Sequence, residues 1–100
     1  MAWTLFEIPS SKRTELDAAL RDDLVSRQSQ KVREASALGG PSDQLYVLVE
    51  GSAPAVEHAR GLIAPLGKQL TGPEGETLYR RFKDEEEAAS AGMGLFFTEG

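Results

Sequence analysis

The order of strand-like and helix-like segments in this sequence predicts an α+β fold. We expect a ferredoxin-like βαββαβ sandwich, in which two helices cover one face of an antiparallel sheet. Two apolar runs, at 3–8 and 44–50, have the composition of central strands. Each run precedes a segment whose apolar residues recur every three or four positions, which indicates an amphipathic helix. A further helix and strand are predicted after residue 72.

Length and composition support a single domain. The chain has 100 residues, of which 40% are hydrophobic and 27% are charged, as in ordinary globular proteins. We divide it into a sandwich over 1–72 and a helix–strand extension over 73–100. The sequence contains no apolar run of membrane-spanning length, no leader pattern and no cysteine. We therefore expect a cytoplasmic protein with no membrane contact, no disulfide and no cofactor.

The first half of the sandwich begins with the strand at 3–8, which ends at Pro9. Its alternating side chains are apolar on both faces, as expected of a central strand. A helix is predicted from about Ser11 to Ser26 because leucines and alanines recur at helical spacing there and a serine can cap its start.

The segment 28–38 is ambiguous. Its composition favours an extension of the helix, whereas the topology favours a strand, since central strands need edges. We prefer a helix that reaches about Gln30 and is followed by a strand. The rival assembly lacks both doubtful strands, this one and a short one at 68–70, and has three strands and three helices.

The segment 44–66 contains the clearest β-α unit of the chain. Gln44 to Glu50 forms a strand, Gly51 ends it, and Ser52 caps a helix with Pro54 in its first turn. The part from Leu45 to Leu66 resembles the strand–turn–helix half of ferredoxin-like regulatory modules.

The last segments are a helix from Thr71 to Ala91 and a strand at 93–98. Thr71 and Glu74 have the spacing of a capping box, and Gly92 ends the predicted helix. The apolar strand closes this chain's own sheet or pairs with a second subunit. Because small α+β domains often gain core by self-association, we expect a homodimer.

One ligand site follows from the predicted topology. The first and third strands are expected to lie side by side and parallel, which would bring the starts of two helices together with free N–H groups, hydroxyls and two cations. Such a site suits a small anion. Alternatively, the serines only cap helices and the cations are solvated. The residues of this predicted anion site are Ser10, Ser11, Lys12, Arg13, Gly51 and Ser52.

Other polar groups carry weaker signals. His58, the only histidine, lies beside the apolar stripe of its helix and has no visible partner for catalysis or metal binding. The acidic run 84–87 fans out around a helix, so a charged outer face is favoured over a docking surface for a basic partner. No metal site is expected.

These observations favour a binding or regulatory module with a small anionic ligand. The alternative is a small enzyme that uses His58 or a carboxylate. The net charge of −5 disfavours nucleic acid, and an RNA-binding sheet would need exposed aromatic residues among basic ones.

Overall fold

The computed structural model describes the backbone of residues 2–99 and the side chains of residues 2–86. Strands and helices alternate along the chain, and short 3-10 turns join several of them. In chain order the elements are β1 (Ala2–Pro9), η1 (Ser10–Lys12), α1 (Arg13–Leu20), η2 (Val25–Arg27), β2 (Ser29–Glu34), η3 (Ala35–Leu38), β3 (Gln44–Gly51), α2 (Ala53–Ile63), η4 (Ala64–Leu66), β4 (Lys68–Gln69) and α3 (Gly72–Glu99).

The four strands form one antiparallel sheet in the order β2-β3-β1-β4. The predicted α+β class is therefore confirmed. β1 and β3 occupy the centre, pair along eight residues each and are apolar on both faces, as their sequences indicate. β4 pairs with β1 through two residues only and is a short edge strand.

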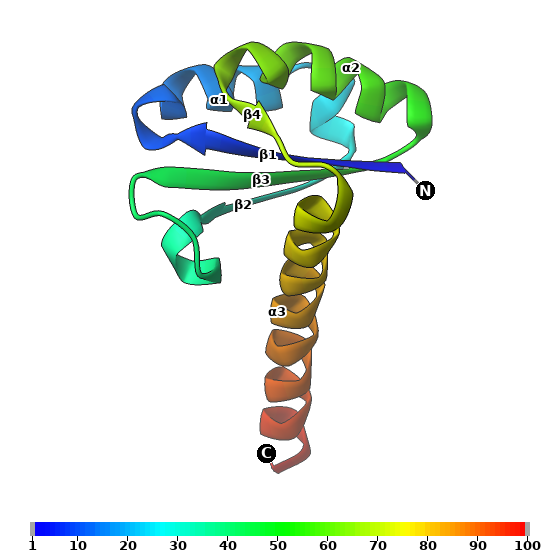
Figure 1. Cartoon of the computed structure of the whole chain (residues 1–100). Coiled ribbons are helices and arrows are strands. Elements are labelled where there is room, and N and C mark those ends of the chain that lie inside the picture. Colours follow the sequence, from blue (N-terminus) through cyan, green and yellow to red (C-terminus); the bar gives the residue numbers. More distant parts are fainter. Residues whose placement is uncertain (1, 100) are drawn as a thin grey trace.

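The two faces of the sheet are covered differently (Figure 1). Helices α1 and α2 cover one face, as predicted, and the first part of α3 packs against the other, a position that the sequence did not indicate. The core under α1 and α2 consists of Phe6, Ile8, Leu16, Leu20, Val25, Leu45, Val47, Val49, Ala59 and Ile63. The core under α3 consists of Leu5, Ala35, Leu38, Tyr46, Leu48, Leu70, Leu78 and Phe82.

The first helix is shorter than predicted. α1 ends at Leu20 rather than near Ser26, and a turn leads into η2. The cause is Asp22, whose carboxylate accepts the backbone N–H groups of Leu24, at 3.1 Å, and Val25, at 3.3 Å. A side chain that binds backbone donors two and three positions ahead offers an alternative to helical pairing.

The ambiguous segment 28–38 contains a strand, β2, followed by the 3-10 turn η3. The expected strand is confirmed, while the expected helix up to Gln30 is wrong. The Gln30 side-chain amide donates to the carbonyls of Leu20, at 2.8 Å, and Val25, at 3.0 Å, and so ties the strand to the end of α1. Because β2 and β4 both exist, the three-strand rival is also wrong.

The predicted final strand at 93–98 is wrong as well. These residues belong to α3, which runs to Glu99 without a break, and their side chains lie outside the described residues. A strand needs a neighbour to satisfy its backbone groups, and α3 leads the chain away from the sheet (Figure 1). The expected homodimer, which drew on an exposed strand here, loses that support and stays a prediction.

Candidate functional site

The residues of the predicted anion site do not come together. β1 and β3 are adjacent, as expected, but they are antiparallel, so their carboxyl ends lie at opposite ends of the sheet. Pro9 pairs with Gln44, whereas Gly51 pairs with Ala2, which is seven positions from Pro9 at the other end of β1. At a rise of about 3.4 Å per residue, the two halves of that site are about 24 Å apart.

Of these residues, Ser52 and Arg13 have side-chain partners among the described residues. Ser52 caps α2 as predicted, because its hydroxyl accepts the Ala55 N–H at 3.4 Å. No side chain caps η1 or α1, so the expected cap from Ser11 is absent. Arg13 pairs with Asp17 one turn along α1, at 3.3 Å. Lys12 and Arg13 are ordinary exposed side chains at the start of α1.

His58 contacts a carboxylate that the sequence did not reveal. Its Nε2 lies 3.0 Å from Asp22 Oδ2, and both side chains are partly exposed. The His58 contact is the largest of the effects that lower the Asp22 pKa. The same carboxylate caps the turn after α1, so the pair joins that turn to α2. Among residues 2–86, no group of three or more His, Asp or Glu side chains is arranged to hold a metal ion.

The acidic run at the middle of α3 faces basic side chains of β2. Glu85 pairs with Arg33 at 2.5 Å, and Glu86 pairs with Lys31. Sequence reasoning considered a basic partner outside the chain, but β2 supplies one within it. The pairing could not be read from the sequence because the partners are more than fifty positions apart.

A buried carboxylate fixes α3 to the sheet above these pairs. Glu50 is 6% exposed, and its two oxygens accept from the Tyr79 hydroxyl at 2.7 Å and from Lys83 Nζ at 2.6 Å. Burial, the largest single effect, raises the pKa of Glu50, but the two hydrogen bonds and the charges of Lys83 and Lys31 together outweigh it and lower the pKa. Trp3 stacks on Tyr79 with ring centroids 4.6 Å apart. Both carboxylate oxygens of Glu50 have partners on α3, so this cluster positions α3.

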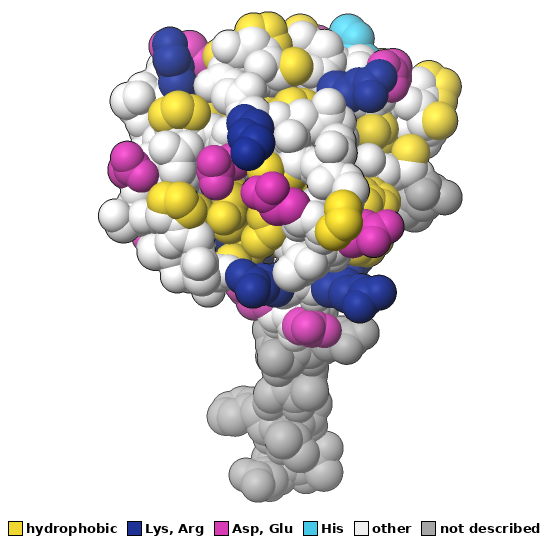
Figure 2. All heavy atoms as spheres, in the orientation of Figure 1, with side chains coloured by type: hydrophobic (Ala, Val, Ile, Leu, Met, Phe, Trp, Pro, Cys, Tyr) yellow, Lys and Arg dark blue, Asp and Glu magenta, His cyan; other side chains and the backbone are white. Residues whose placement is uncertain are grey.

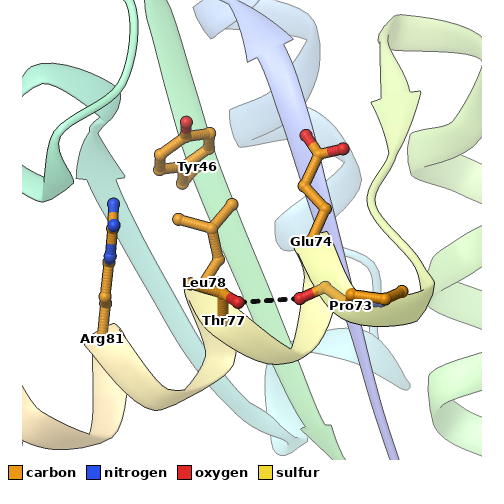
Figure 3. A pocket seen from close by; sticks show the side chains of 6 residues that line it. All are labelled: Tyr46, Pro73, Glu74, Thr77, Leu78 and Arg81. Atoms are coloured by element: carbon orange, nitrogen blue, oxygen red, sulfur yellow. Dashed lines mark hydrogen bonds between the residues drawn. The ribbon is translucent and has the colours of Figure 1, made fainter.

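A pocket of about 320 Å³ lies on the opposite flank of α3. It is bounded by β3 and the first three turns of α3 (Figure 3). On the molecular surface, apolar atoms are visible beside the base of α3, between acidic and basic side chains (Figure 2). The residues that line the pocket are Tyr46, Pro73, Glu74, Thr77, Leu78 and Arg81.

The Tyr46 hydroxyl is the unusual group in this pocket. The Tyr46 side chain is 6% exposed, yet within the described side chains its hydroxyl makes no hydrogen bond. No fully buried polar side-chain atom of that part of the chain lacks a partner, so this oxygen keeps some contact with solvent. Burial raises the pKa of Tyr46, and the carboxylates of Glu7 and Glu74 add to the effect, so the phenol stays protonated and can donate.

Arg81 forms one wall of the pocket. Its Nη1 donates to the Leu38 carbonyl at 2.6 Å, which anchors the guanidinium beside the loop after η3. That loop approaches closely because it contains two glycines: Gly39 has φ +82°, and a Cβ on Gly40 would lie 2.1 Å from the Tyr46 hydroxyl. Sequence reasoning noted the glycines only as a breaker and missed the pocket.

The comparisons with known proteins add no identity. No family model, curated protein or solved structure matches the chain. Within the described part of the chain, none of the helices combines the length and apolar character needed to cross a membrane. The site must therefore be interpreted from its own chemistry.

Proposed function

We propose that this protein is a small binding module that holds a small anionic ligand in the pocket between β3 and α3. The observation that carries the proposal is that Tyr46, whose hydroxyl makes no hydrogen bond to the described residues, and Arg81 both line this pocket. A solvent-accessible hydroxyl without a protein partner is hydrogen-bonded to water, and a ligand can displace that water. The volume is at the lower end of the range for small-molecule sites, roughly 300–1,000 Å³.

The pocket is lined by one anion, Glu74, and one cation, Arg81, and its hydrogen-bond donors favour an anionic group at the Arg81 end. Arg81 uses one nitrogen for the Leu38 carbonyl, and the other N–H groups of its planar guanidinium stay available. Together with the Tyr46 hydroxyl, they offer a carboxylate or phosphate donors from two elements of the fold. Leu78 and Pro73 supply apolar surface beside these donors.

We also propose that residues 1–72 are a ferredoxin-like sandwich. The succession β1, α1, β2, β3, α2, β4 supports this proposal, as does the position of β1 between β3 and β4. In this arrangement α3 is an added element that builds the pocket on the sheet face that α1 and α2 leave open. The homodimer also stays a proposal, and a solution mass near twice 10.8 kDa would support it.

A thermal-shift titration tests the ligand site. Acetate, succinate and inorganic phosphate serve as probes at millimolar concentration, and at ten times Kd a ligand stabilises the folded state by about 1.4 kcal/mol. Tyr46→Phe and Arg81→Gln should each weaken the shift. Arg80→Gln is the matched control, because Arg80 neighbours Arg81 but does not line the pocket. Absence of any anion-dependent shift, or equal shifts in all variants, would contradict the proposal.

A second candidate function is acid–base catalysis by His58. The Asp22 contact supports it, since a carboxylate can orient the ring and stabilise its charged form. Activated ester and phosphate substrates, assayed with the native chain and with His58→Gln, test this candidate. Equal rates for the two proteins would rule it out.

A further inference from the structure

We propose that the ligand of this pocket is a small zwitterion whose carboxylate and ammonium groups are separated by an apolar chain. The inference rests on the proposed function, because it concerns the same pocket. It adds a second recognition group, Glu74, and thereby specifies the chemical class of the ligand.

Glu74 and Arg81 are placed by the geometry of α3. They are seven residues apart, so they lie on nearly the same face of the helix and about 10.5 Å apart along its axis. Figure 3 shows both side chains extending in the same direction from α3, with Tyr46 and Leu78 between them. The pocket therefore has an acceptor at one end and donors at the other.

The surface between the two charges is largely apolar. Leu78 is 5% exposed and the Tyr46 side chain is buried beside it, so a hydrocarbon chain can pack against both. The Thr77 hydroxyl is already used, because it donates to the Pro73 carbonyl at 2.8 Å. This middle part of the pocket favours methylene groups over further charge.

The two ends fix the orientation of such a ligand. Its carboxylate binds Arg81 and the Tyr46 hydroxyl, which are donors. Its ammonium binds the Glu74 carboxylate, an acceptor with no donor partner among the described side chains. An α-amino acid carries its two charges on one carbon, so it cannot reach both ends, whereas an ω-amino acid can.

Four six-carbon probes separate these features: 6-aminohexanoate has both charges far apart, norleucine has both on one carbon, hexanoate has only the anion, and hexylamine has only the cation. We would measure their dissociation constants for the full chain by calorimetry. Since an exposed ion pair contributes about 0.2–1 kcal/mol, 6-aminohexanoate should bind up to about fivefold tighter than hexanoate and norleucine. Hexylamine should bind weakest.

Two variants test whether Glu74 binds the ammonium group of the ligand. Glu74→Gln should bring 6-aminohexanoate to the affinity of hexanoate while hexanoate binds no more weakly than before. Glu76→Gln is the matched control, because Glu76 is on the same turn of α3 but does not line the pocket.

The outcomes distinguish the two proposals. If hexanoate or norleucine binds as tightly as 6-aminohexanoate, and Tyr46→Phe weakens all of them, the zwitterion is wrong and the anion site stands. If no probe binds, both proposals fail. Loss of the 6-aminohexanoate preference in Glu74→Gln alone, with Glu76→Gln unaffected, supports the zwitterion.

Discussion

The two faces of the sheet are built from different chemistry. The face under α1 and α2 is closed by ten buried hydrocarbon side chains, and its helices are positioned by their apolar stripes. The face under α3 also has a hydrophobic centre, but a buried carboxylate cluster lies on one flank of the helix and the pocket on the other.

This difference shows how one sheet can provide both stability and a site. A hydrocarbon interior is stabilised by burial and needs no particular partner for each group. Buried polar groups must each find a partner, so they fix the position of α3 more narrowly than apolar contacts would. The pocket lies beside Tyr46, whose hydroxyl has no hydrogen-bond partner among the described residues and keeps contact with solvent.

The largest effects are expected from the two hydrophobic centres. Phe6→Ala, in the core under α1 and α2, and Phe82→Ala, in the core between α3 and the sheet, should each lower the free energy of unfolding by about 3–5 kcal/mol. Both side chains are almost fully buried. Urea denaturation followed by far-UV circular dichroism measures this loss. A loss below about 1 kcal/mol for Phe82→Ala alone would show that α3 contributes little to the fold. It would contradict the assignment of a second hydrophobic core to that face of the sheet.

The next largest effect on stability is expected from the buried carboxylate of Glu50 beside α3. Glu50→Ala removes the acceptor of both Tyr79 and Lys83, and should lower the free energy of unfolding by about 1–3 kcal/mol. The near-ultraviolet signal of the stacked Trp3 and Tyr79 should change with it. Glu76→Ala, at an exposed position of the same helix, is the control and should change neither quantity.

The same carboxylate makes stability depend on pH. The folded-state pKa of Glu50 lies below its usual value of 4.5, so the unfolded chain takes up the proton first as the pH falls. The contribution of Glu50 is therefore fully present above pH 4.5 and is lost as the pH falls through the lower folded-state pKa. In acid titrations, the stability difference between the native chain and Glu50→Gln should shrink in this range. A difference that is constant down to pH 2 would contradict the assignment.

The smallest effect on stability is expected at the start of α2, on the face of the sheet that α1 and α2 cover. Ser52→Ala removes the cap of α2 and should lower the free energy of unfolding by about 1 kcal/mol, as measured by thermal or urea unfolding. Ser11→Ala is the matched control, because Ser11 caps no helix, and it should leave stability unchanged. Equal losses in both variants would mean that capping does not distinguish the two serines.

The candidate site was only partly accessible from the sequence. The sequence identified the helix start near Thr71, the breaker at Gly39 and the buried strand that carries Tyr46. Nothing in it indicated that these three segments meet, since Tyr46 and Arg81 are 35 positions apart and no motif links them. The predicted anion site failed for a related reason: the direction in which β1 and β3 pair was assumed, and the opposite direction separates its halves.

By itself, the sequence determined the α+β class, the central strands β1 and β3, the capped start of α2 and the two apolar faces of β1, because periodicity and local hydrogen bonding are properties of neighbouring residues. Only the tertiary structure decided the end of α1 at Leu20, the side of the sheet on which α3 lies, the partners of Glu50 and the pocket at Tyr46. Each of these depends on groups far apart along the chain or on a choice between competing hydrogen bonds. Such choices are settled by packing, and packing exists only once the chain has folded.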